Sequence, residues 1–297
     1  MSVDRHKIAA RVQRGLWVIF FAQIVVRPFM DLPYGYWVSW LPALGAIAVG
    51  AVVSRSAGRR IETRPPAPVE VAPPVTGRWS ALNSPADKVP SHGTHHLAQT
   101  YAIDIVAEPE EGARPAPVWF WPVAHRNRAY PAFGASLHAV ADGTVVHAED
   151  GQRDHLSRSS LIGVLYFWLI EGACRTLGGS RRIVGNHVVL DLGDGTYALY
   201  AHVQRRSLEV RAGDRVVTGQ VLGRCGNSGN STQPHVHFQL MDGPDMDTAH
   251  GVPFSWRGVG VPSGGQAFEA GEDAAVPRRP AVPGPGPQPS PEPSRRP

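Results

Sequence analysis

Two long apolar runs near the start of the chain predict membrane-associated helices. The run from Leu32 to Val53 has 22 residues and no charge, and about 20 apolar residues suffice to cross a bilayer as a helix. The run from Gly15 to Val26 has only 12 residues before Arg27, so it is either a short first span or a segment in the membrane interface. We expect a membrane anchor within residues 1–60, with 32–53 as its best span.

Short alternating runs of apolar and polar residues fill the middle of the chain. Such alternation is typical of strands that bury one face, and it occurs at 143–148, 186–192, 194–203 and 234–240. Asp142-Gly143 and Asp194-Gly195 are dipeptides that favour hairpin turns. The pattern predicts a mostly β, antiparallel domain, built as a sandwich or a barrel-like sheet.

One segment of this region lacks the alternation. Residues 160–176 contain ten consecutive apolar or glycine residues, too few to span a membrane. We expect a helical insertion between strands, which either packs on the sheet or touches a bilayer held nearby by the anchor.

Proline-rich stretches bound the alternating region on both sides. Residues 61–76 read as an extended linker, and the last 21 residues of the chain contain nine prolines, a composition that cannot bury a core. The predicted domain therefore covers 77–255, and the predicted tail, 256–297, is disordered; we expect its part after Pro277 to be dispensable for activity.

The charge distribution argues against a nucleic-acid partner. The formal net charge is +4, but 12 of the 29 basic residues lie in 1–60 or after Pro277, and the stretch 61–277 has 17 basic and 22 acidic residues. A phosphate-binding surface needs Lys and Arg on the folded domain. The two cysteines, Cys174 and Cys225, are too few for a disulfide scaffold, and their spacing leaves open whether they pair.

The chemistry is concentrated in histidines. His235 and His237 are two residues apart in a strand-like run, so both imidazoles project to the same face of the sheet. Two such rings can bind a transition metal, or divide metal binding and proton transfer between them.

The surrounding motifs occur in an order that resembles a known family. In chain order they are HGTHHLAQTYAIDIV (92–106), LHAVADGTVVHAEDG (137–151), GNHVVLDLGDGTYALYAHV (185–203) and VRAGDRVVTGQVLGRCGNSGNSTQPHVHFQL (210–240). This set resembles the lysostaphin-type (LytM-like) zinc metallopeptidases, which are peptidoglycan endopeptidases. The resemblance implies the duplicated-hybrid-motif type of β fold and a Zn²⁺ cofactor.

The resemblance also implies roles for individual residues. Asp104 and His237 match zinc ligands, His202 and His235 match non-ligand catalytic histidines, and Tyr200 matches the tyrosine of the family's Y-x-H motif, a substrate-binding position. The first histidine ligand is open, because the family's H-x-x-x-D spacing would place it at Thr100. The candidates are His92, which we favour slightly, then His95, and also His96.

These inferences predict a membrane-anchored zinc endopeptidase acting on peptidoglycan peptides. The alternative is a catalytically degenerate module that binds cell wall or regulates another hydrolase. A lipoyl- or biotin-type carrier also fits part of 210–223, but Lys88 is the only lysine of the predicted domain and lies outside that hairpin. The oligomeric state is not predicted.

The side of the membrane depends on the number of spans. Five basic residues precede residue 32, and three lie directly after Val53, within residues 54–60. By the positive-inside rule, one span places the domain outside the cytoplasm, whereas two spans return it to the side of the N-terminus. Because peptidoglycan lies outside, we expect an extracytoplasmic domain at the cell membrane.

Overall fold

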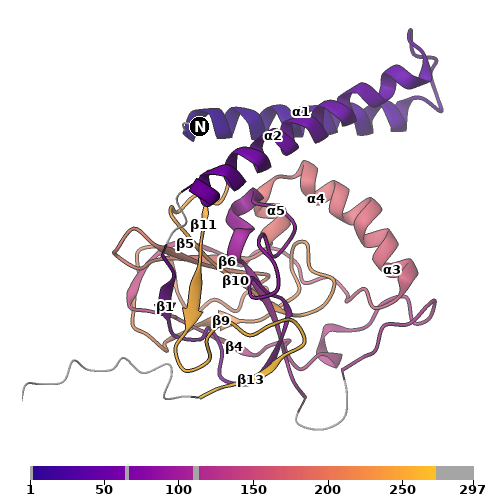
Figure 1. Ribbon diagram of the computed structural model, residues 1–297. Helices are drawn as coiled ribbons and strands as arrows, with labels where there is room; N and C mark the ends of the chain where they lie inside the picture. The colour runs from indigo at the N-terminus through magenta and orange to yellow at the C-terminus, as the bar shows by residue number, and fades with distance from the viewer. Residues whose placement is uncertain (1–2, 64–66, 110–113, 272–297) are drawn as a thin grey trace, which may run out of the picture.

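Two long helices precede the β domain in the computed structural model, which describes residues 3–63, 67–109 and 114–271. Helix α1 (Val3–Val26) is followed by a short 3₁₀ turn, η1 (Tyr36–Trp40), and by α2 (Leu41–Thr63). The helices lie side by side over the β domain (Figure 1). Their segments Ile8–Val26 and Tyr36–Ser56 have 19 and 21 residues and are long and apolar enough to cross a membrane.

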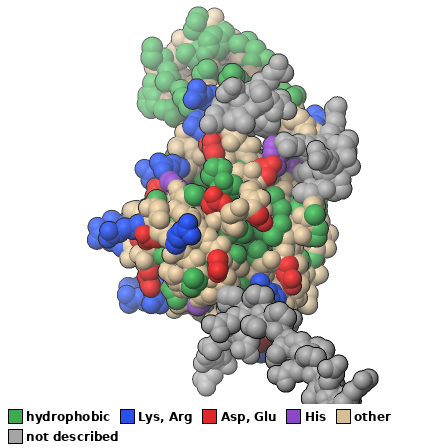
Figure 2. Space-filling view, turned by 90° about the vertical axis from the view of Figure 1, so that its left-hand side faces the viewer, with side chains coloured by type: hydrophobic (Ala, Val, Ile, Leu, Met, Phe, Trp, Pro, Cys, Tyr) green, Lys and Arg blue, Asp and Glu red, His purple; other side chains and the backbone are tan. Residues whose placement is uncertain are grey.

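The two helices are exposed along most of their length, and apolar side chains dominate this upper part of the molecule (Figure 2). Helices of a globular core would bury such side chains. Phe20 of α1 packs against Trp40, the last residue of η1 before α2, with ring centroids 5.2 Å apart. The predicted short run thus forms part of a full-length helix, and the described residues contain two candidate spans.

A nine-stranded antiparallel sheet forms the centre of the β domain. Its order is β13-β2-β3-β10-β7-β6-β5-β8, and β11 pairs with β10 beside this path. The bounds are β2 Gly77–Asn83, β3 Ile103–Ala107, β5 Gly143–Glu149, β6 His187–Asp191, β7 Tyr197–Ala201, β8 Arg215–Val216, β10 Val236–Met241, β11 Gly251–Val252 and β13 Ala267–Ala270. The prediction of a mostly β, antiparallel domain is confirmed.

Two small sheets cover one face of this large sheet. They pair β1 (Val69–Val71) with β12 (Phe254–Trp256) in parallel, and β4 (Ser136–His138) with β9 (Val221–Arg224) in antiparallel. The main core combines residues of both layers, such as Phe238 of β10, Leu137 of β4 and Trp256 of β12. Because alternate residues of β10 enter this core, its intervening residues face the opposite side of the sheet.

The folded domain extends beyond the predicted limits 77–255 at both ends. Val71 and Val75, in the predicted linker, are buried in the core, and β13 adds an edge strand whose Phe268 is also buried. The added strands, β1 and β13, are short and pair with strands that are distant in the sequence. Local alternation therefore did not predict them. Of the predicted tail, 272–297 lies outside the described residues.

One predicted hairpin is present and the other is not. Gly193 and Gly195 adopt φ of 86° and 87° between β6 and β7, a left-handed conformation that glycine tolerates without strain. Asp142-Gly143 joins strands of different sheets instead, and the Asp142 carboxylate accepts hydrogen bonds from Thr218. The Asp142-Gly143 dipeptide does form a turn, but the strands before and after it belong to different sheets.

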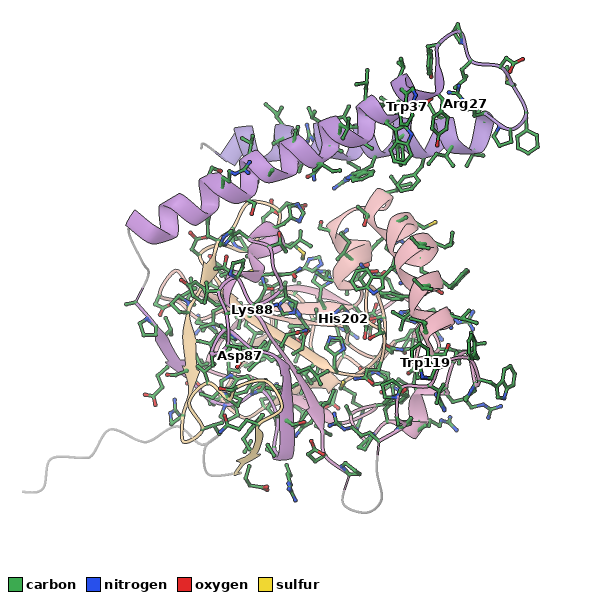
Figure 3. The ribbon with its side chains drawn as sticks, turned by 45° about the vertical axis from the view of Figure 1, so that its right-hand side comes forward. Arg27, Trp37, Asp87, Lys88, Trp119 and His202 are labelled. Carbon is green, nitrogen blue, oxygen red and sulfur yellow. The ribbon has the colours of Figure 1, made fainter. Side chains whose placement is uncertain are left out.

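The predicted insertion is helical. It runs through α3 (Leu161–Tyr166), the π-helical turn η4 (Phe167–Gly172), α4 (Ala173–Leu177) and α5 (Ser180–Val184). Phe167 is buried, while Trp168 and Leu169 are 61% and 67% exposed. Trp119, on a neighbouring loop, also points outward (Figure 3). The insertion therefore packs on the domain through one stripe and leaves an apolar face uncovered.

Two short 3₁₀ turns complete the fold. They are η2 (His96–Tyr101) and η3 (Asn127–Ala129). Within η2, Leu97 and Ala98 have φ of 55° and 59°, a conformation that is uncommon for residues other than glycine. The segment before β3 consequently turns back towards the sheet.

Candidate metal centre

Asp104 and His237 meet because their strands are neighbours in register. His237 of β10 is directly opposite Asp104 of β3, and the His237 Nδ1 lies 2.8 Å from the Asp104 Oδ1. His92 approaches from the loop before η2, with its Nε2 2.8 Å from the Asp104 Oδ2. The ligand atoms of these three residues all lie within 4.8 Å of one another.

Hydrogen bonds on the far side of the His237 and His92 rings determine which nitrogen of each ring carries the proton. The other nitrogen turns its lone pair towards the Asp104 carboxylate. Gln239 donates from its Nε2 to the Leu97 carbonyl, so its Oε1 accepts a hydrogen bond from the His237 Nε2–H at 3.0 Å. His237 therefore presents an unprotonated Nδ1 to Asp104.

His92 is oriented in the same manner. The Ser91 hydroxyl donates to the Ala102 carbonyl at 2.6 Å, so its oxygen accepts from the His92 Nδ1 at 3.0 Å. The His92 Nε2 is then a lone pair towards Asp104. Two nitrogen lone pairs and a buried carboxylate repel one another unless a cation lies among them. A metal ion that takes nitrogen and oxygen ligands satisfies all three groups.

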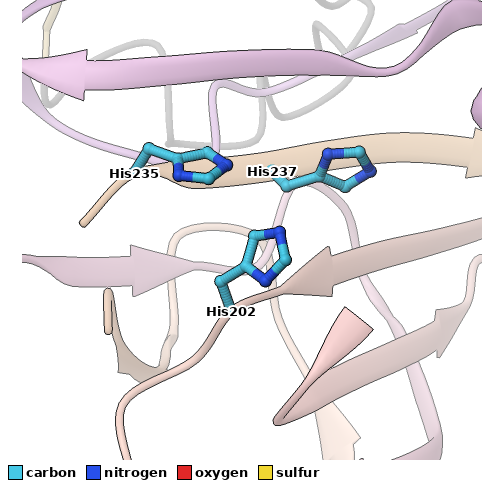
Figure 4. Close-up of side chains that lie close together, drawn as sticks. All are labelled: His202, His235 and His237. Atoms are coloured by element: carbon cyan, nitrogen blue, oxygen red, sulfur yellow. The ribbon is translucent and has the colours of Figure 1, made fainter. Parts of the chain in front are cut away.

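His202 and His235 lie beside His237 (Figure 4). The ring centroid of His202 is 4.8 Å from that of His235 and 5.7 Å from that of His237. The His202 Nδ1 donates to the Ser228 carbonyl at 2.9 Å, and the His235 Nδ1 donates to the Gln233 carbonyl at 2.8 Å. Each ring thus turns its Nε2 towards the centre.

The backbone of His202 is held in an uncommon conformation. Its φ is 60°, in the left-handed region that costs a non-glycine residue free energy. The amide of His202 donates to the Val184 carbonyl in the insertion. Strained residues of this kind cluster at functional sites.

Burial and charge shift the pKa values in different directions. Burial raises the pKa of Asp104, but the charge of His235 and its hydrogen bond to the carboxylate oppose this effect, and the pKa is held well below its usual range. Burial lowers the pKa of His202, and the neighbouring His235 and His237 lower it further. For His235, burial is outweighed by Asp104, which raises the pKa. His202 is therefore neutral, and His235 retains a proton more readily.

The remaining predicted site residues lie elsewhere. The His95 Nδ1 is 2.9 Å from the Thr100 Oγ1, and neither His95 nor His96 joins a candidate ligand cluster in the described part of the chain. Tyr200 requires a correction. Its side chain points into the main core, fully buried, and its hydroxyl accepts from the Val140 amide at 2.9 Å. Residues 200 and 201 alternate across the sheet, so Tyr200 is on the face opposite the centre and cannot contact a substrate there.

Four residues of the site were missed by the sequence reasoning. Asn83 donates to Asp104 at 2.8 Å, Gln239 orients His237, and Phe167 and Trp168 line the same pocket as the histidines. Gln239 follows His237 by two residues, so strand alternation alone could have placed it on this face. Asn83, Phe167 and Trp168 carry no comparable signal.

Comparisons with known proteins identify the domain. A sequence profile described as peptidase family M23 matches residues 170–248, which include His202, His235 and His237 but neither His92 nor Asp104. The glycyl-glycine endopeptidase ALE-1 of Staphylococcus capitis is 38% identical over 74 residues, 25% of this chain and 18% of that protein. The peptidoglycan DD-endopeptidase ShyA of Vibrio cholerae is 37% identical over 57 residues, 19% of this chain and 13% of that protein.

A solved structure is also similar. The catalytic domain of the peptidase lysostaphin from Staphylococcus simulans shares 23% identity at a TM-score of 0.28, covering 47% of this chain and 86% of that one. The chain spans less than a fifth of the length of the relatives ALE-1 and ShyA. The similarity to lysostaphin-type peptidases that the motifs indicated is confirmed by the profile and by these relatives. The chain carries a domain of peptidase family M23.

Proposed function

We propose that this chain is a zinc-dependent endopeptidase that hydrolyses peptide bonds of peptidoglycan and is held at the membrane by α1 and α2. The observation that carries the proposal is the convergence of two imidazole lone pairs on the Asp104 carboxylate, with two more histidines beside them. Three protein ligands with room beside them are typical of catalytic zinc sites.

His92, Asp104 and His237 would hold the zinc ion. Zinc supplies Lewis acidity, which activates a water molecule and polarises the scissile carbonyl. The side chains of Asn83, Gln239 and Ser91 keep the ligands oriented through the hydrogen bonds described above, as outer-shell groups of metal sites do.

His202 and His235 would move protons and stabilise charge. The neutral His202 has its Nδ1 proton engaged by the Ser228 carbonyl, so its Nε2 is a proton acceptor. His235, when protonated, can donate from Nε2 to the oxygen that becomes negative as the carbonyl is attacked, while its Nδ1 donates to the Gln233 carbonyl. Phe167 and Trp168, on the wall of the pocket, would reduce the access of bulk water.

The proposal is tested by metal content and by digestion of purified peptidoglycan, with products identified by mass. Asp104→Ala and His237→Ala should lose zinc and activity together. His202→Ala and His235→Ala should keep zinc and lose at least ~10²-fold in rate, the usual scale for a lost acid–base group. His92→Ala should lose zinc, whereas the matched control His95→Ala should keep it.

A chain that binds cell wall without cutting it would contradict the proposal and support the degenerate module. Zinc lost from His95→Ala but kept in His92→Ala would overturn only the ligand assignment.

A further inference from the structure

A second cluster of potential ligands lies on the same large sheet, two strands away from the metal centre. His147 and Glu149 alternate along β5, and Glu149 is directly opposite His187 of β6. His187 and His237 face the same side of the sheet, since the core residues Val188 and Phe238 alternate with them. The ligand atoms of His147, Glu149 and His187 all lie within 4.8 Å of one another.

His187 presents a buried nitrogen that lacks a partner. The side chain is fully buried, and its Nδ1 donates to the Gly185 carbonyl at 2.8 Å. This bond fixes the tautomer and leaves the Nε2 as a lone pair. Among the described residues no group forms a hydrogen bond with that Nε2, although leaving a buried polar atom unsatisfied costs about 1–3 kcal/mol.

The other two residues complete a set of donors. The His147 ring stacks on the His187 ring with centroids 4.5 Å apart, and the His147 Nε2 is 3.8 Å from the Glu149 Oε2. The other carboxylate oxygen of Glu149 accepts from Gln152 at 3.2 Å, which restrains the carboxylate. Two imidazoles and one carboxylate form a donor set that suits zinc and related transition ions.

Arg181 occupies the mouth of this cluster. Its Nε lies 3.3 Å from the Glu149 Oε2 and its Nη2 lies 3.2 Å from the His147 Nε2. The Arg181 side chain is 64% exposed, so it can leave towards solvent without losing a buried contact. A guanidinium that contacts two of the three donors supplies the positive charge that a metal ion would otherwise bring.

We propose that His147, Glu149 and His187 form a second site for a divalent transition-metal ion of the zinc type, and that Arg181 competes with the metal for it. The site is independent of the proposed peptidase activity, because it shares no residue with the metal centre. Arg181 then has an effect opposite to that of the ligands: it weakens metal binding.

The test uses the full chain in detergent, stripped with a chelator and then titrated with Zn²⁺, with bound metal measured after gel filtration. The variant His237→Ala empties the first centre and serves as the background. This background should retain one zinc per chain. Adding His187→Ala or Glu149→Gln should weaken the remaining binding by at least ~10-fold, the lower end of the loss seen when the surroundings of a metal are altered.

Arg181→Ala is the decisive variant, since a surface substitution leaves the fold intact. In the same background it should tighten zinc binding up to about fivefold, the scale of an exposed charge pair. His138→Ala, which removes a histidine of β4, is the matched control and should change nothing. The proposal is overturned if the background chain retains no zinc, if zinc binding is unaffected by Glu149→Gln, or if Arg181→Ala weakens it.

Discussion

At the scale of single residues, position on the sheet decides what a side chain can do. Tyr200 and His202 belong to one short motif, yet the Tyr200 ring packs in the core and the His202 ring faces the candidate metal centre. The buried Tyr200 hydroxyl satisfies the Val140 amide, which links β7 to the chain before β5. The tyrosine thus supports the site from behind.

Tyr200→Phe separates a structural role from a substrate-binding one. The change leaves the Val140 amide buried without its acceptor, so the free energy of unfolding should fall by about 1–3 kcal/mol. We expect KM and zinc content to stay as in the parent chain, measured beside chemical denaturation curves. An increased KM at unchanged stability would show instead that Tyr200 contacts substrate.

The two cysteines should differ sharply in reactivity. Both are free; Cys174 is exposed and Cys225 is buried. Burial, together with the nearby Asp154, raises the pKa of the Cys225 thiol, and the thiolate is the reactive form. In the folded chain, thiol reagents should modify one cysteine, and Cys174→Ser should abolish this modification. The second cysteine should react only after unfolding. Rapid modification of both thiols in the native protein would disagree with this burial.

At the scale of elements, the sequence predicted what depends on local pattern. Alternation in 234–240 predicted that His235 and His237 share a face, and they do. The pairing of β10 with β3, which brings Asp104 to His237 across 133 residues, depends on register between distant strands and could not be derived from local pattern. The choice between His92 and His95 depends on the path of the loop before η2, where His92 reaches Asp104 and His95 contacts Thr100. Local pattern does not specify that path.

The insertion offers a matched pair of neighbours in opposite surroundings. Phe167 is 1% exposed, whereas Leu169 is 67% exposed. Phe167→Ala should lower the free energy of unfolding by about 3–5 kcal/mol through cavity formation. Leu169→Ala should change it by no more than about 0.5 kcal/mol, as is usual for surface positions. Thermal or denaturant melts of both variants in detergent check this, and equal losses would indicate a different helix register.

At the scale of the whole molecule, the end of the described chain is part of the domain. Strand β13 pairs with β2 and buries Phe268. A chain ending at residue 262 loses this edge strand, and burying one phenylalanine alone contributes about 1.5–3 kcal/mol. We expect its melting temperature to fall clearly, while a control ending at residue 271 keeps that of the full chain. Equal melting temperatures would show that β13 adds nothing to stability.

The side of the membrane can be read from the exposed thiol. Two antiparallel spans would place both ends of the helical pair, and with them the β domain, on one side of the membrane. Basic residues such as Arg14 and Arg55 favour the cytoplasm for those ends. A peptidoglycan substrate, in contrast, requires the β domain outside the cytoplasm. We expect a membrane-impermeant maleimide to label Cys174 in wall-stripped cells, with Cys174→Ser as the control. Labelling only after permeabilisation would place the domain inside and contradict the proposed substrate.

The separation of Asp104 and His237 along the chain has a consequence for when activity arises. The strand that carries His237 is inserted between β3 and β7, at the middle of the sheet, and non-local pairings of this kind form late in folding. During synthesis, the unfolded chain holds the proposed ligands too far apart to assemble a centre. The topology would therefore delay assembly of the proposed zinc centre, and any hydrolytic activity that depends on it, until the domain is complete.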